Sequence, residues 1–164
     1  MQPTYTKPDQ LLRYKTLREI LAGKPPGVYF VPPDATVLSA LQRMAEKDVG
    51  ALAVIDQGRL AGVFSERDYA RKVVLSGRTS KDTLVSEVAT DDVFFVSPEH
   101  TVPQCMELMT EKRIRHLPVV ERGEVIGMLS IGDLLKEMLG HHEQLLRQMA
   151  IERTILLTPD PSSY

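Results

Sequence analysis

This sequence of 164 residues has few cysteines and no long apolar run. Its one cysteine, Cys105, excludes an internal disulfide and favours a reducing compartment such as the cytoplasm. No apolar run approaches the roughly 20 residues of a membrane-spanning helix, and the first residues lack the apolar core of a signal peptide. We therefore expect a cytoplasmic protein without a membrane partner.

Charge of one sign and catalytic motifs are also sparse. The net charge of −2 gives no general attraction to nucleic acid, so any anion site must be local. No carboxylate pair stands beside a plausible nucleophile, and no Gly-x-x-x-x-Gly-Lys loop is present. His141 and His142 are adjacent and lack the i, i+4 spacing of a zinc pair. We expect no enzyme, no metal site and no nucleic-acid partner.

The most informative feature is an internal repeat at an offset of 65 residues. The shared residues are those that physics constrains most: turn glycines, buried valines and a Ser-x-x-Asp pair. Such a repeat is typical of one supersecondary unit used twice, since one copy cannot bury its apolar face alone. The matched pairs include Val54 and Val119, Gly58 and Gly123, Ser65 and Ser130, and Asp68 and Asp133.

Each copy predicts the element order β-α-β-β-α. An extended segment at 28–31, or at 93–96 in the second copy, precedes a helix. In the first copy this helix begins at Asp34 or Thr36, and Gly50 marks its end.

A hairpin and a second helix complete each copy. Gly58 or Gly123 supplies the positive φ that a short hairpin turn needs. Ser65 and Ser130 stand three residues before an aspartate where a strand gives way to a helix, which is a capping arrangement. In the second copy the last helix is expected to continue past Gly140.

Further elements are expected in the segments that flank the repeats. Apolar residues at helical spacing predict a helix over 10–22, and a short helix over 83–88 resembles 15–20 at an offset of 68. The apolar segment 151–157 is expected to dock on a partner subunit or on the amino-terminal helix.

The repeats predict an α+β fold. Two β-α-β-β-α units would be related by a pseudo-twofold axis, with their sheets packed face to face and the helices outside. This axis would bring the two Ser-x-x-Asp corners to a shared cleft. The expected organisation is an amino-terminal arm and helix over 1–22, a first repeat over 23–89, a second repeat over 90–149 and a carboxy-terminal tail over 150–164.

The two units resemble CBS domains, and together they resemble the tandem arrangement called a Bateman module. The resemblance covers about 17–139 and is closest in the second repeat, at 115–120, 127–130 and Asp133. The first repeat departs from the pattern at Ala53, where the family usually has proline. The resemblance implies a stand-alone CBS pair that forms disc-shaped homodimers. It also implies a regulatory, non-catalytic role in which AMP, ADP, ATP, S-adenosylmethionine or NAD(H) binds between the repeats.

An adenosine phosphate needs an apolar slot for the base, acceptors for the ribose hydroxyls and cations for phosphate. Asp68 and Asp133 can each accept two ribose hydroxyls, because an ionised carboxylate only accepts hydrogen bonds. Ser65 and Ser130, with the free N–H groups of the helix starts, can hold phosphate at the positive end of a helix dipole. The planar fork of Arg67 can reach the same phosphate.

Other residues complete two expected pockets. Arg115 and His116 form a second cationic source. The base would lie against Thr36, Val49, Ala51 and Val63 in one pocket, or against Thr101, Ile114, His116 and Met128 in the other.

The two pockets are expected to be unequal. Arg67 stands beside Asp68, whereas Gly132 stands beside Asp133. We therefore expect the pocket of Asp68 to hold phosphate more tightly.

Several functions remain open. The favoured one is an adenine-nucleotide sensor in signal transduction, read by an unidentified downstream protein. The alternatives are an S-adenosylmethionine binder and a structural dimerisation module with vestigial pockets. A nucleotide-converting enzyme lacks supporting motifs.

Overall fold

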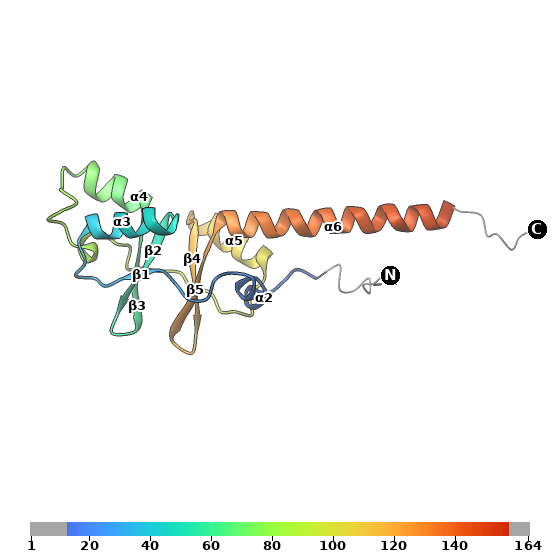
Figure 1. Cartoon of the computed structure of the whole chain (residues 1–164), viewed down its shortest axis with the longest axis horizontal. Coiled ribbons are helices and arrows are strands. Elements are labelled where there is room, and N and C mark those ends of the chain that lie inside the picture. Colours follow the sequence, from blue (N-terminus) through green and yellow to red (C-terminus); the bar gives the residue numbers. More distant parts are fainter. Residues whose placement is uncertain (1–12, 158–164) are drawn as a thin grey trace, which may run out of the picture.

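The computed structural model describes residues 13–157. Two small sheets and the helices packed around them form one part of the molecule, here called the body (Figure 1). The first repeat contains β1 (Phe30–Val31), α3 (Val37–Lys47), β2 (Ala51–Asp56), β3 (Arg59–Ser65), α4 (Glu66–Asp68) and the π-helix η1 (Tyr69–Val74). The second contains α5 (Val102–Lys112), β4 (His116–Glu121), β5 (Glu124–Ser130) and α6 (Ile131–Leu157). Two short helices precede the repeats, α2 (Leu17–Ala22) and the 3₁₀ helix η2 (Val85–Glu87).

The two sheets share one topology, although the second is smaller. In the first sheet β2 is parallel to β1 and antiparallel to β3, while β4 and β5 form the second as an antiparallel hairpin. Val96 makes a parallel bridge to Val119, at the position where Val31 pairs with Val54. The α+β class and the pair of related repeats are therefore confirmed, with β3 and β5 in contact.

Both hairpin turns contain two residues with positive φ. Gln57 and Gly58 have φ of 47° and 81°, and Arg122 and Gly123 have φ of 52° and 84°. A two-residue turn of this kind matches the right-handed twist of the strands that it joins. The predicted role of the turn glycines is confirmed.

The segment before each repeat packs on the other repeat. Backbone N–H groups of α2 donate to carbonyls just before α5, and those of η2 donate to the equivalent carbonyls before α3. The offset of 68 between α2 and η2 thus reflects one structural role used twice. The donor and acceptor pairs are Leu17 with His100, Arg18 with Pro98, Val85 with Ala35, and Ser86 with Pro33.

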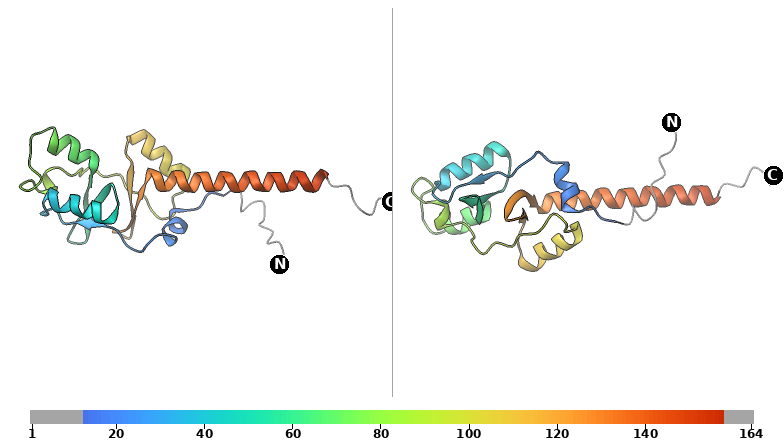
Figure 2. Two further views of the ribbon diagram at one scale, coloured as in Figure 1. Left: turned by 45° about the horizontal axis from the view of Figure 1, so that its top comes forward. Right: turned by 90° about the horizontal axis from the view of Figure 1, so that it is seen from below.

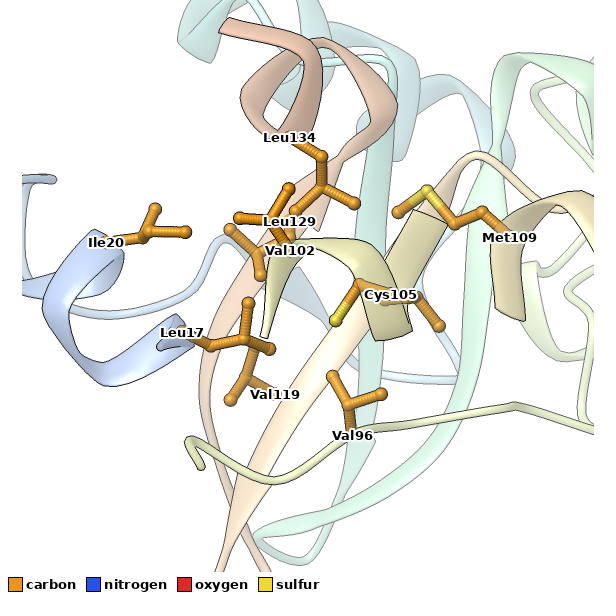
Figure 3. Close-up of a cluster of buried hydrophobic side chains, with 10 residues drawn as sticks. Leu17, Ile20, Val96, Val102, Cys105, Met109, Val119, Leu129 and Leu134 are labelled. Atoms are coloured by element: carbon orange, nitrogen blue, oxygen red, sulfur yellow. The ribbon is translucent and has the colours of Figure 1, made fainter. Parts of the chain in front are cut away.

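Two buried clusters result from this exchange. Figure 3 shows the second-repeat cluster, to which Leu17 and Ile20 of α2 belong together with Val102 and Cys105 of α5. Val85 and Val88 take the corresponding places in the first-repeat cluster. Each repeat therefore buries apolar side chains that precede the other repeat in the sequence.

The segments that cross from one repeat to the other pass so close to the sheets that two strand positions have room only for glycine. A Cβ on Gly62 would lie 2.9 Å from the carbonyl oxygen of Thr90, which is bonded to the backbone of Val63. A Cβ on Gly127 would lie 2.6 Å from Cδ2 of Leu21. A side chain at either position would separate the crossing segment from its sheet.

Two helix boundaries differ from the sequence prediction. Within the described residues, the predicted helix over 10–22 begins only at Leu17, because Thr16 is extended and forms a bridge with Thr101. α3 ends at Lys47, before the predicted Gly50, because Asp48 adopts the left-handed conformation with φ of 51°.

α6 is one helix of 27 residues that extends beyond the body (Figure 1 and Figure 2). Its predicted continuation past Gly140 is confirmed. The prediction that 151–157 docks on the amino-terminal helix is wrong for 151–154, whose side chains are exposed, because α6 carries them away from α2. None of the helices described between residues 13 and 157 is long and apolar enough to cross a membrane.

Candidate functional site

The first Ser-x-x-Asp corner lies where β3 ends and α4 begins. Asp68 Oδ2 accepts hydrogen bonds from the backbone N–H and the hydroxyl of Ser65, at 3.0 and 2.6 Å. Asp68 Oδ1 accepts one from the Thr90 hydroxyl at 2.9 Å and forms an ion pair with Lys72, also at 2.9 Å. Four donors thus surround a buried carboxylate, and its usual accepting capacity is filled.

The second corner lies between β5 and α6 and has fewer donors. Asp133 Oδ2 accepts hydrogen bonds from the backbone N–H and the hydroxyl of Ser130, at 2.8 and 3.0 Å, and from Lys24 Nζ at 2.9 Å. No donor among residues 13–157 bonds to Oδ1. The side chain of Asp133 is 30% exposed, against 11% for Asp68. Asp133 therefore keeps accepting capacity that Asp68 has lost.

Both carboxylates are ionised at neutral pH. Burial alone would raise the pKa of Asp68 and of Asp133, since it disfavours the charged form. The hydrogen bonds and the lysine partners described above outweigh burial and lower both pKa values below the ordinary value.

A hollow of about 490 Å³, here called the first hollow, lies beside the corner of Asp68. One wall comes from the first repeat and another from the residues at the start of β4 in the second repeat, and residues within 90–94 of the segment between the repeats also line it. Its lining includes Val63, Arg67, Asp68, Arg71, Thr90, Phe94, Ile114, Arg115 and His116.

A second hollow of about 320 Å³ lies beside the corner of Asp133. It is built in the same way as the first hollow, but the two repeats have changed roles. The corner now comes from the second repeat and the facing strand start from the first. Its lining includes Lys24, Val28, Tyr29, Val49, Gly50, Ala51, Met128, Ser130 and Asp133.

An aromatic ring lies at the same place in each hollow. Phe94 lines the first hollow and Tyr29 the second, and the two residues are equivalent at the repeat offset. The ammonium of Lys112 lies 5.2 Å from the centroid of the Phe94 ring, and that of Lys47 lies 5.9 Å from the Tyr29 ring. Each hollow thus contains a planar apolar surface against which a flat ring can stack.

His116 lines both hollows, as does Gly50. A Cβ on Gly50 would lie 3.6 Å from His116 Nε2 and 3.4 Å from Glu66 Oε2, so the imidazole occupies the space that a larger residue would fill. Burial lowers the pKa of His116 below its ordinary value, against the opposing effect of Glu66 and Asp133. The imidazole is therefore neutral at pH 7.

This arrangement agrees with the comparison with known families. The CBS domain model matches residues 18–75 and 85–140, which together make up more than half of the chain. The chain belongs to the CBS-domain family. It contains two CBS domains in tandem, as the resemblance implied.

Individual relatives support the same conclusion. The mitochondrial CBS domain-containing protein CBSX3 of Arabidopsis thaliana is 41% identical over 121 residues, which is 71% of this chain and 59% of that protein. A solved CBS-domain structure from Burkholderia ambifaria, described as a candidate signal-transduction protein, is 47% identical with a TM-score of 0.74, and the match covers 77% of this chain and 95% of the other. A hexameric CBS-CP12 protein from bloom-forming cyanobacteria is 28% identical with a TM-score of 0.66, covering 76% of this chain and 72% of the other.

The predicted base-lining residues divide between the two hollows in a different way from that expected from the sequence. Val49 and Ala51 lie with Met128 in the second hollow, whereas Ile114 lies with Val63 in the first. The reason is that each hollow joins the corner of one CBS domain to the strand start of the other. His116 belongs to both.

Thr36 and Thr101 line neither hollow. The Thr36 hydroxyl accepts a hydrogen bond from the N–H of Ser39 at the start of α3, and Thr101 caps α5. Their backbones form bridges with Leu84 and Thr16, on the side where the CBS domains exchange segments. The structure thus places both threonines away from the two hollows, and their contact with a base stays a prediction.

The helix starts offer fewer free N–H groups than the sequence analysis assumed. The N–H of Glu66 donates to the Gly50 carbonyl at 3.1 Å, and the N–H of Ile131 donates to the Arg115 carbonyl at 2.9 Å. The serine and aspartate N–H groups bond within their own corners. Side chains must therefore provide most of any phosphate contact at these hollows.

Several lining residues could not be predicted from the sequence. Lys24, Arg71 and Thr90 lie outside the matched motifs, so no repeated pattern marks them. Tyr29 and Phe94 carried a usable signal, because aromatic residues recur there at the offset of 65.

Proposed function

We propose that this CBS pair is a regulatory module that binds an adenine nucleotide, such as AMP, ADP, ATP or NAD(H), and acts as a ligand sensor in signal transduction. One observation carries the proposal. Each hollow combines an ionised Ser-x-x-Asp corner from one domain with the strand start of the other domain. A ligand held there touches both domains at once.

The first hollow has the charges that phosphate needs. Arg67, Arg71 and Arg115 all line it. Arg67 Nη1 donates to the Arg113 carbonyl at 2.8 Å, which fixes the direction of the guanidinium and leaves its other N–H groups for a ligand. The volume of about 490 Å³ lies within the usual range of small-molecule sites. These features support the expectation that phosphate binds more tightly here than in the second hollow.

The second hollow has the better acceptor for ribose. Asp133 keeps one oxygen without a donor from residues 13–157, whereas a ribose at Asp68 must displace Lys72 or Thr90. A hydrogen bond to an ionised carboxylate is stronger than a neutral one, so this free oxygen favours a sugar. We infer that adenosine without phosphate prefers the second hollow.

The alternatives rest on narrower observations. S-adenosylmethionine is cationic at its sulfonium, and the carboxylates of Asp48 and Asp133 line the second hollow. A structural dimerisation module would leave both hollows without a ligand.

A sensing role follows from the fact that residues of both domains line each hollow. A ligand that fits one arrangement of the two domains better than another shifts the population toward it, typically by about 1–3 kcal/mol of coupling. The proposal includes a homodimer, an unidentified downstream protein and a cytoplasmic location. It includes no catalytic step, metal or nucleic acid.

A thermal-shift panel with AMP, ADP, ATP, NAD, NADH, S-adenosylmethionine and adenosine tests the proposal. A ligand at 100 times its Kd is expected to add about 2.7 kcal/mol to the free energy of unfolding, which raises the melting temperature. Guanosine nucleotides serve as matched controls for the base. Stabilisation by S-adenosylmethionine alone favours the first alternative, and a panel without any shift favours the structural module.

A further inference from the structure

The exposed side of α6 carries an apolar stripe that belongs to neither hollow. Leu135, Leu139, Leu146 and Met149 are 43%, 63%, 67% and 64% exposed. Together with His142 they recur at intervals of three and four residues, which is the spacing of a coiled-coil seam. These five residues are called the α6 stripe below.

The two flanks of the α6 stripe differ. Tyr14 occupies one of them, with its ring centroid 4.3 Å from that of His141 and its hydroxyl 3.3 Å from His142 Nε2. The opposite flank carries Lys136 and Glu143, both exposed, and no ion partner for either lies within residues 13–157. A partner helix can therefore approach from the flank that carries these two opposite charges.

The length of α6 adds a second reason to expect a partner. At 1.5 Å per residue, a helix of 27 residues is about 40 Å long. Its far half lies beyond the sheets and the other helices (Figure 2). Helices draw most of their stability from the packing of an apolar face, and here that face is left to solvent.

We propose that the α6 stripe pairs with the α6 stripe of a second copy of this chain, in antiparallel orientation. With the axis between Gly140 and His141, Leu135 of one copy lies against Leu146 of the other. The same register places Lys136 of each copy beside Glu143 of the other, which makes two ion pairs. The inference is independent of nucleotide binding.

Charge argues against the parallel arrangement. A parallel pair would stack Arg153 against Arg153 on the axis, and its flanking positions would bring together no opposite charges. The antiparallel pair leaves Arg153 outside the overlap and uses both charged flanking residues. Charge complementarity therefore selects the orientation.

Sedimentation equilibrium of the full chain tests the pairing. Leu139→Lys is expected to weaken self-association by about tenfold or more, because it places a charge in the seam. The matched control is Ile151→Lys, since Ile151 is also exposed on α6 but lies on the opposite face, and it is expected to leave the association constant unchanged. A monomeric wild-type chain, or equal effects of the two variants, would overturn the proposal.

A charge exchange tests the register. Lys136→Glu and Glu143→Lys are each expected to weaken association several-fold, whereas the double variant restores it because both ion pairs re-form in reverse. A double variant weaker than either single one contradicts the register.

A spin label at Arg153→Cys tests the orientation. Cys105 is buried and burial raises the pKa of its thiol to about 11, so the new cysteine reacts selectively. The antiparallel pair separates the two labelled positions by about 38 Å along the helices, whereas a parallel pair holds them about 10 Å apart. A short distance would show that the orientation is wrong.

Discussion

Lys24 and Asp133 join the two ends of the CBS pair. Lys24 follows α2, which enters the first repeat, and Asp133 stands in the first turn of α6, which leaves the second. The ammonium lies 2.9 Å from Asp133 Oδ2 and 3.4 Å from the carbonyl of Met128. The carboxylate that we propose for ribose is therefore already held by a cation of the same chain.

Replacing Lys24 is expected to raise the pKa of Asp133. In Lys24→Met the carboxyl loses a partner that lowers its pKa, and NMR titration of Asp133 measures the change. The depressed pKa contributes stability at neutral pH that is lost as the pH falls below about 3.8, so the variant loses less stability than wild type in that range. At pH 7 the free energy of unfolding is expected to fall by less than about 1 kcal/mol, because both side chains are partly exposed.

Lys81→Met is the matched control for this change, since Lys81 is an exposed lysine away from both hollows. An unchanged titration of Asp133 in Lys24→Met would show that the ion pair is absent in solution.

The two aspartates are expected to affect different ligands. Asp68→Ala is expected to weaken ATP binding by about tenfold and to leave adenosine binding nearly unchanged, because the arginines attract ATP to the first hollow, where its ribose takes the place of Lys72 or Thr90 at Asp68. Asp133→Ala is expected to do the reverse, because adenosine without phosphate prefers the second hollow. Isothermal titration calorimetry measures both affinities. Each variant is first melted, because Asp68→Ala leaves the Ser65 and Thr90 donors without their acceptor. Unchanged ATP affinity in Asp68→Ala, together with its loss in Asp133→Ala, would reverse our assignment of the hollows.

Three glycine substitutions are expected to rank by the atom that the new Cβ meets. Gly62→Ala forces a backbone carbonyl aside and destabilises by about 2–3 kcal/mol, since backbone cannot rotate away. Gly127→Ala meets the end of the Leu21 side chain, which can move, and costs about 1 kcal/mol. Gly140→Ala meets open space inside a helix and stabilises by about 0.5–1 kcal/mol. Urea unfolding measures all three, and equal losses at Gly62 and Gly127 would contradict the ranking.

His116 is expected to make stability depend on pH. Burial lowers its pKa in the folded chain, so the unfolded chain binds more protons as the pH falls below about 6.5. The wild type therefore loses stability between neutral and mildly acidic pH. In His116→Gln this loss is smaller, and urea midpoints between pH 7.5 and 5.5 measure it. His100→Gln is the control, because His100 lines neither hollow. Identical slopes for His116→Gln and wild type would count against a half-buried neutral imidazole.

Periodicity and spacing predicted the parts of the fold that local physics determines. The hairpin turns follow from Gly58 and Gly123, and the corners follow from Ser-x-x-Asp at the strand ends, because both depend on neighbouring residues alone. The exchange of α2 and η2 could not be predicted in this way. The offset of 68 marks the two segments as equivalent, but nothing local indicates which apolar cluster each of them joins.

In the candidate site, too, the features that depend on neighbouring residues were predicted and those that depend on long-range packing were not. Asp68 and Asp133 were found because they repeat, and both line hollows between the domains. The position of Ala51 and Met128 in one hollow was not predicted, because it depends on the orientation in which the two domains pack. Lys24 was missed because its partner is more than one hundred positions away, and sequence spacing carries no record of such a contact.

The exchanged segments also determine how this chain can be divided. A cut between η1 and η2 would leave an amino-terminal fragment whose interior lacks Val85 and Val88, and a carboxy-terminal fragment whose interior lacks Leu17 and Ile20. Neither piece would be a complete folding unit, yet each would carry the side chains that the other needs. Each domain therefore depends on the other for a complete apolar core, and expressing either one alone would expose an open apolar surface.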